Sequence, residues 1–172
     1  MSPYGLFPDA QEEPNEAAYQ GKAGTVPDKL KRPAQIIETL QQADFRPVEL
    51  QWHRLGGEEY VLAHDAQAHT RLVRAGADGQ LRVQETWKPD EIMPAARRLF
   101  AQATHSSEVL TTHDAYYYQR HPEAMNGASI QGLPALRLDY ENAERTRVYI
   151  DLHTGEVVNS LPESYRVRRW LF

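Results

Sequence analysis

The side chains in this sequence that are best suited to metal binding or proton transfer are its histidines. They are His53, His64, His69, His105, His113, His121 and His153. A transition-metal site needs two to four donors that converge at about 2 Å. Residues 64–69 and 113–121 each bring two histidines and an aspartate close together in the sequence. Neither stretch has two histidines at the i,i+4 spacing of a helix or the i,i+2 spacing of a strand. We therefore expect surface or hydrogen-bonded histidines and no metal site.

The best candidate for a binding surface is a run of three tyrosines followed by a loop rich in asparagine and glycine. Tyrosine offers a large contact area at a low cost in side-chain entropy, and its hydroxyl gives it a polar tip. The candidate binding residues are Tyr116, Tyr117, Tyr118, Arg120, His121 and His113. In a strand, Tyr117 would face away from its two neighbours. The alternative is that one or two of these tyrosines fill the core while the others cap a sheet.

Signatures of known catalytic sites are missing from the sequence. It contains no phosphate-binding glycine loop, no His-Glu-x-x-His zinc helix and no Gly-x-Ser-x-Gly elbow. It has no cysteine, which excludes disulfides, thiolate metal sites, iron–sulfur clusters and cysteine nucleophiles. Neighbouring acids such as Glu58 and Glu59, or Asp139 and Glu141, are expected to be solvated on exposed strands. We expect no catalytic residue, no cofactor and no enzymatic activity in this domain.

The composition is typical of a folded chain that does not bind nucleic acid. The 172 residues, of which 41% are hydrophobic, suit one domain or two small ones that share a core. The formal charge is −5, whereas phosphate binding needs a concentrated basic surface. No apolar run approaches the length needed to span a bilayer. Arg166, Arg168 and Arg169 come just before Trp170, an order that is common at membrane boundaries. The alternative for this end of the chain is a strand that buries Trp170.

Hydrophobic periodicity predicts two helices, each followed by several short strands. After an extended lead-in over residues 1–28, the first helix is expected to begin near Pro33 and to end near Asp44. The strands expected after it are at residues 48–53, 59–64, 70–75 and 80–84. The second helix is expected from about Asp90 to Ala103. The strands expected after it are at residues 107–112, 136–140, 145–152 and 156–159.

The two halves of the chain share an internal repeat. Thr70-Arg71-Leu72 matches Thr146-Arg147-Val148, and at the same offset Gly79 matches Gly155. Both glycines lie where a hairpin turn needs a positive φ. The fold class is therefore α+β, with two units that each pack a helix on an antiparallel β-sheet. Such units could pack sheet against sheet or align edge to edge. We favour the second arrangement, which gives one longer sheet with both helices on one side.

Three segments of the second half match the pattern of a known family. They are Arg147-Val148-Tyr149-Ile150-Asp151, Thr154-Gly155-Glu156-Val157-Val158 and Arg168-Arg169-Trp170-Leu171-Phe172. These segments resemble the second PepSY unit of the PepSY-associated transmembrane-helix proteins. The resemblance implies a degenerate first PepSY-like unit over residues 29–86. It implies a second unit over residues 87–172, and comparison of the two repeats places the extra length of this unit in an inserted loop at about 115–132. It also implies a domain outside the cytoplasmic membrane, held by flanking membrane helices that are absent from this chain.

The residues and the resemblance together predict a non-catalytic periplasmic binding or regulatory domain of a PepSY-type integral membrane protein. The expected location is the periplasmic side of the bacterial inner membrane. The expected partner is a protein or a peptide, and nucleic acid is not expected. The resemblance also implies two alternatives. One is an accessory domain of an iron–siderophore reductase or uptake system, with a ferric siderophore as ligand. The other is a peptidase-inhibitor-like module. An ordinary cytosolic interaction protein is a third.

Overall fold

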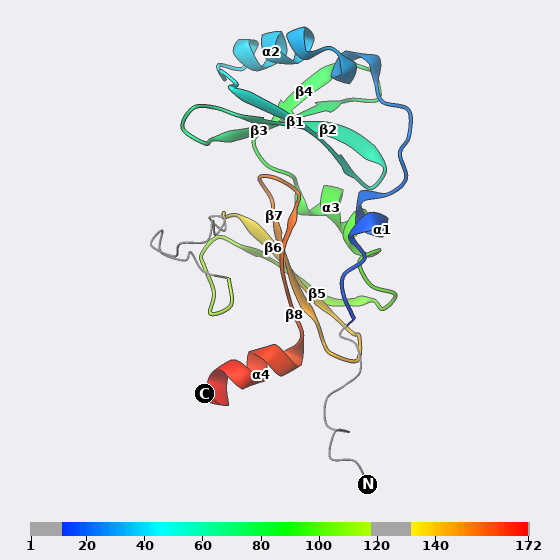
Figure 1. Ribbon diagram of the computed structural model, residues 1–172, viewed down its shortest axis with the longest axis vertical. Helices are drawn as coiled ribbons and strands as arrows, with labels where there is room; N and C mark the ends of the chain where they lie inside the picture. The colour runs from blue at the N-terminus through cyan, green and yellow to red at the C-terminus, as the bar shows by residue number, and fades with distance from the viewer. Residues whose placement is uncertain (1–11, 118–131, 172) are drawn as a thin grey trace.

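The computed structural model describes residues 12–117 and 132–171, with side chains as far as residue 167. It confirms the α+β class, with two four-stranded antiparallel sheets (Figure 1). The first half contains α1 (Glu16–Gln20), the 3-10 helix η1 (Asp28–Lys31), α2 (Pro33–Gln42), β1 (Glu49–Leu55), β2 (Glu58–His64), β3 (Thr70–Ala75) and β4 (Leu81–Gln84). The second half contains α3 (Pro89–Ala96), β5 (Thr104–Leu110), β6 (Ala135–Tyr140), β7 (Arg147–Asp151), β8 (Val157–Leu161) and α4 (Glu163–Leu171).

Each half places a helix before an antiparallel meander. The strand order is β1-β2-β3-β4 in the first sheet, here called sheet A, and β5-β6-β7-β8 in the second, sheet B. The sequence repeat falls on equivalent positions, because Thr70 begins β3 and Thr146 immediately precedes β7. Gly79 and Gly155 have φ values of 75° and 77°, each in the turn before the last strand of its sheet. Glycine adopts this conformation without the strain that a Cβ would bring, so it lets both hairpins close.

One face of sheet A is covered by α2 and η1 (Figure 1). Leu30, Ile36 and Leu40 from these helices have no exposed surface. They pack in one cluster with Val61 and Val73, which lie opposite each other on β2 and β3. Burial of such side chains contributes about 1.5–3 kcal/mol each. A helix as short as α2 is therefore held by its apolar stripe rather than by helix propensity.

Helix α3 lies between the two sheets, with α1 beside it (Figure 1). A single core joins α3 to both sheets, and its members include Tyr60, Leu62, Leu72, Trp87, Ile92, Leu99, Leu138, Val148 and Ile150. Ala95 and Ala96 are small enough for the sheets to come close to the helix, and the Tyr140 hydroxyl donates a 2.6 Å hydrogen bond to the Ala96 carbonyl. The expected edge-to-edge sheet is therefore wrong. The sheets are separate because α3 is buried against both of them.

Three elements differ from those expected from periodicity. Helix α1 interrupts the expected extended lead-in, and Asn15 caps it by accepting a 3.0 Å hydrogen bond from the Ala18 amide. Helix α3 ends at Ala96, earlier than expected, although Leu99 and Phe100 remain buried in the turn that follows. Buried residues in that turn continue the apolar pattern without being helical. The end of the chain is the helix α4, so the alternative of a final strand is also wrong.

Candidate functional site

The two sheets differ in how their faces are covered. Sheet A has α2 and η1 on one face and α3 on the other, whereas α3 and α1 cover only the inner face of sheet B (Figure 1). Among the described helices, α4 is the one that contacts the outer face of sheet B, and it does so through Arg166 from the side of β8. That outer face has paired charges and aromatic rings, and we treat it as the candidate site.

Strand alternation places these polar side chains on the outer face. In β6 the two leucines pack in the core around α3, so Arg137 and Asp139 face outward. Asp139 lies opposite Arg147 of β7. Arg137 lies between Tyr149 of β7 and Glu108 of β5, and it forms an ion pair with Glu108. Opposite charges that face each other across neighbouring strands stabilise the pairing.

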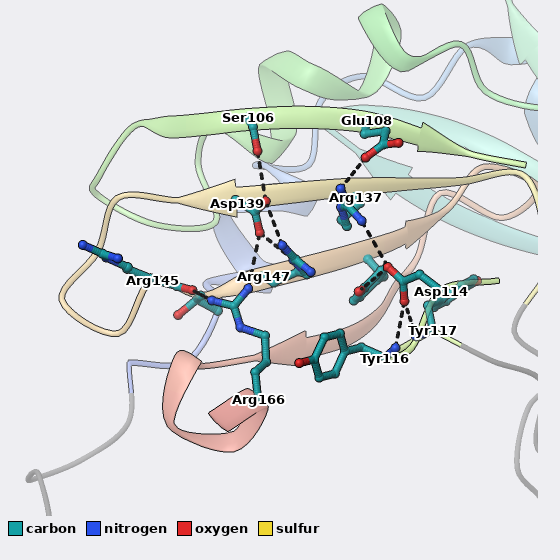
Figure 2. A network of polar contacts seen from close by, with 12 residues as sticks. Ser106, Glu108, Asp114, Tyr116, Tyr117, Arg137, Asp139, Arg145, Arg147 and Arg166 are labelled. Carbon is teal, nitrogen blue, oxygen red and sulfur yellow. Dashed lines mark hydrogen bonds and ion pairs between the residues drawn. The ribbon is translucent and has the colours of Figure 1, made fainter. Parts of the chain in front are cut away.

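Asp139 is the centre of the first polar cluster (Figure 2). Its carboxylate accepts hydrogen bonds from Arg147 Nε at 2.7 Å and from Ser106 Oγ at 2.9 Å, and it lies 3.7 Å from a terminal nitrogen of Arg166. Arg166 also donates a 2.8 Å hydrogen bond to the carbonyl of Arg145. A single carboxylate therefore connects β5 and β7 to α4.

Asp114 is the centre of the second polar cluster (Figure 2). One carboxylate oxygen accepts the amides of Tyr116 at 2.8 Å and Tyr117 at 2.7 Å, which fixes the turn after β5. The other oxygen accepts the Tyr149 hydroxyl at 2.9 Å and Arg137 at 3.2 Å. The turn after β5 is therefore attached to the middle of sheet B.

The described tyrosines of the run have different environments. Tyr117 is fully buried and stacks on Tyr149 with ring centroids 5.0 Å apart. Its hydroxyl donates a 2.7 Å hydrogen bond to the Gly132 carbonyl, which joins the turn after β5 to the residues just before β6. Tyr116 is only partly buried, and the guanidinium of Arg147 lies 6.0 Å from its ring centroid. Tyr116 is therefore the described tyrosine of the run that can reach a ligand.

The structure brings three of the six predicted binding residues together on this face, His113, Tyr116 and Tyr117. His113 is exposed, and its ring centroid lies 5.9 Å from that of Tyr117. Tyr117 fills a small core, as the alternative interpretation of the tyrosine run expects. The remaining predicted residues lie outside the described part of the chain, and they are Tyr118, Arg120 and His121.

Sequence reasoning missed the charged residues that organise the site. They are Asp114, Arg137, Asp139, Arg147 and Arg166. One signal was available, because Arg137 and Asp139 alternate with leucines in a strand pattern. An alternating strand whose polar face has both charges predicts partners on neighbouring strands, but not which partners.

The carboxylates at the two cluster centres hold their negative charge. Burial alone would raise the pKa of Asp139, but the hydrogen bonds and positive charge of Arg147 outweigh it, so that pKa lies below its ordinary value. The pKa of Asp114 is lowered by the same balance of burial and hydrogen bonds. Such groups are poor general acids and bases near neutral pH. Asp151 differs, because burial is the main cause that raises its pKa.

Asparagine substitutions at Asp139 and Asp151 are expected to have opposite effects. Asp139→Asn should lower the free energy of unfolding at pH 7 by about 1–3 kcal/mol, the usual contribution of hydrogen bonds to charged groups. Because the pKa of Asp139 is lowered by folding, this stabilisation is present above the ordinary carboxyl pKa. It is lost as the pH falls through the folded value.

Asp151 has a pKa that folding raises. Its contribution to the free energy of unfolding is therefore favourable at low pH and is lost as the pH rises through its pKa in the folded protein. Asp151→Asn removes a disfavoured charge and is expected to be neutral or to stabilise by up to about 1 kcal/mol at pH 7. Urea unfolding of both variants between pH 7 and about pH 3 measures these effects. Equal losses of stability in the two variants at pH 7 would contradict a lowered pKa for Asp139 and a raised pKa for Asp151.

The histidine stretch at residues 64–69 has a local hydrogen-bond role. Asp65 accepts the amides of Gln67 and His69 and contacts the His69 ring at 2.9 Å, which closes the turn between β2 and β3. Within residues 12–117 and 132–171, no three His, Asp or Glu side chains gather as metal ligands.

A cleft of about 490 Å³ opens at one end of sheet B. Its lining residues are His105, Tyr140, Glu141, Asn142 and Arg145.

None of the helices that the structure describes combines the length and the hydropathy needed to cross a membrane. Comparison of the chain with protein-family models, with curated proteins and with solved structures finds no match.

Proposed function

We propose that this chain is a non-catalytic binding or regulatory domain, and that it binds a protein or peptide partner through sheet B. The supporting observation is the asymmetry of the two sheets. Sheet A is covered on both faces by helices of this chain, whereas the outer face of sheet B presents ordered charges around Asp114 and Asp139. Side chains that are already held by partners lose little entropy when a ligand binds.

The charge balance of the face favours a peptide over an anionic ligand. Arg147 and Arg166 both contact the carboxylate of Asp139, and Arg137 contacts two further carboxylates. Arginines that are already paired offer little net attraction to an anion such as an anionic ferric siderophore. They can still exchange hydrogen bonds with the polar backbone and side chains of a peptide.

We further propose that the domain is of the PepSY type and lies on the periplasmic side of the bacterial inner membrane, as part of an integral membrane protein. The support is the resemblance of Arg147-Val148-Tyr149-Ile150-Asp151 and of the segment at residues 154–158. Each half has a helix directly before four antiparallel strands, which supports what that resemblance implies.

A thermal-shift screen of the purified chain tests the binding function. The screen contains short extended peptides, intact unfolded proteins and ferric siderophores, and it is accompanied by assays of peptide hydrolysis and ferric reduction. Ligands that bind the native state raise the melting temperature by mass action. We expect saturable shifts with peptides and no turnover. Catalytic turnover, or shifts with ferric siderophores alone, would contradict the proposal.

A pair of tyrosine variants locates the binding surface. Tyr116→Ser is expected to weaken peptide binding about tenfold, a typical loss for an aromatic anchor at an interface. Tyr165→Ser is the matched control, because Tyr165 is half exposed on α4 and makes none of the contacts of the two polar clusters. Equal effects of the two substitutions would show that the peptide does not bind over Tyr116 on the outer face of sheet B.

A further inference from the structure

The edge strand β5 is exposed in a way that ordinary edge strands are not. In the described part of the chain β5 pairs with β6 alone. Residues 105–109 are all exposed, although a strand over a core normally buries every second residue. Neither face of this stretch is therefore covered by the residues that the structure describes. The sheet ends in a row of backbone amides and carbonyls that can form hydrogen bonds with another strand.

The features that usually protect edge strands are sparse in β5. Its sequence, Thr-His-Ser-Ser-Glu-Val-Leu, contains no proline and no lysine. The pairing with β6 is irregular between Thr104 and Ser106, and it is regular from Ser106 to Leu110. The regular stretch is long enough to take an added strand by backbone pairing.

A second copy of the chain does not fit this edge well. Two β5 strands that pair antiparallel over residues 106–110 place Glu108 of one copy directly opposite Glu108 of the other. Like charges in that position are destabilising. The side chain of Glu108 is 57% exposed, so its carboxylate would meet its own counterpart across the new pair.

The same side chains define what an added strand should contain. On the outer face, Glu108 already pairs with Arg137, but its side chain is 57% exposed, so a basic residue opposite it can share the carboxylate. On the inner face, Val109 is 41% exposed and lies opposite Leu136, so an aliphatic residue added beside it gains contact area. Alternate residues of a strand point to opposite faces. A strand with alternating basic and aliphatic residues therefore satisfies both faces of β5 at once.

We propose that the free edge of β5 binds an extended peptide segment with alternating basic and aliphatic residues, which joins sheet B as a fifth strand. This inference rests on the proposed binding function and names the class of partner and its place on the sheet. Backbone hydrogen bonds supply the affinity of such an added strand, and the side chains at alternate positions supply its specificity.

The test uses the full chain and a fluorescently labelled peptide of alternating lysine and valine with capped ends. Binding is followed by fluorescence anisotropy at physiological salt. Two control peptides have the same sequence but are N-methylated at one or the other set of alternate amides, so charge and side chains are kept. A third control alternates glutamate with valine. We expect saturable binding of the first peptide and about tenfold weaker binding of one N-methylated form, because ladder hydrogen bonds supply the affinity.

Variants of the chain place the peptide on β5. Glu108→Gln and Val109→Thr should each weaken binding severalfold, and Glu38→Gln, on the exposed side of α2, should leave it unchanged. Equal binding of the lysine–valine peptide and both of its N-methylated forms, or equal binding by both glutamine variants, would show a general attraction to the acidic chain and overturn the proposal. Equal binding of the glutamate–valine peptide would show that the edge does not select a basic residue, and it would also overturn the proposal. A dimer of the free chain that the peptide dissociates would assign the edge to a second copy and also overturn it.

The outcome for β5 can be separated from the outcome for the binding function. If other peptides bind and the β5 variants have no effect, the inference about β5 fails while the binding function stands. If no peptide binds at all, both fail.

Discussion

Replacing Trp87 by alanine is expected to lower the free energy of unfolding of the whole chain by about 3–5 kcal/mol, the cost of removing a large aromatic side chain from a core. Trp87 is 2% exposed and lies in the core shared by both sheets. Its ring meets Tyr60 edge-on at 5.0 Å, and the guanidinium of Arg74 lies 4.4 Å from its ring centroid. Its backbone amide donates a 2.8 Å hydrogen bond to the carbonyl of Leu152 in the second half.

Urea unfolding followed by circular dichroism measures the effect, and the melting temperature should fall by on the order of 10 °C. A single transition should shift as a whole, because α3 joins both sheets in one core. Trp52→Ala is the control. Trp52 is 44% exposed on β1 and donates a 2.8 Å hydrogen bond to the carbonyl of Leu30, so we expect a smaller loss of about 1–2 kcal/mol. Two transitions, with only one of them changed by Trp87→Ala, would show that the halves fold separately.

Alanine at Gly155 is expected to cost clearly more than alanine at its repeat partner, Gly79. Both glycines have a positive φ, and a Cβ in that conformation costs about 1–2 kcal/mol. A Cβ at Gly155 would also lie 2.7 Å from Trp87 Nε1 and 3.2 Å from a methyl carbon of Leu55. A Cβ at Gly79 would meet no atom within 4 Å. Overpacking of this kind adds about 1–3 kcal/mol.

The pair Gly155→Ala and Gly79→Ala is therefore a matched comparison of two equivalent turns. The expected losses are about 3 kcal/mol or more at Gly155 and about 1–2 kcal/mol at Gly79. Urea unfolding under the same conditions compares them. Equal losses would show that the turn at Gly155 does not pack against the shared core.

Local patterns predicted the strands well because each depends on neighbouring residues. The alternation of apolar and polar residues predicted the ends of β1 to β4 to within one or two residues. Glycine marked the hairpin turns at Gly79 and Gly155. Helix α1 was missed because a helix of five residues has almost no periodicity, although Asn15 before Glu16 is a capping signal. The packing of α3 against both sheets was missed because the apolar pattern of a helix does not say how many partners it has.

The candidate site was predicted only in part for a similar reason. The tyrosine run is conspicuous in the sequence, and Tyr116 does lie on the outer face of sheet B. The partners of Asp114 and Asp139, the two carboxylates that organise the candidate site, depend on strand register. Register brings Arg137 and Arg147 beside them from other parts of the chain. Such pairs follow from the fold and cannot be read from spacing along one segment.

Mapping of backbone amide NMR shifts during a peptide titration tests most directly whether this chain is a binding domain that acts through sheet B. The lysine–valine peptide is the probe, and the amides of all described residues other than proline are observed together. The account predicts saturable shifts that concentrate on residues 104–117 and 135–149 and leave α2 and the face of sheet A beneath it unchanged. Shifts centred on sheet A, or no saturable shift with this or any other extended peptide, would contradict it.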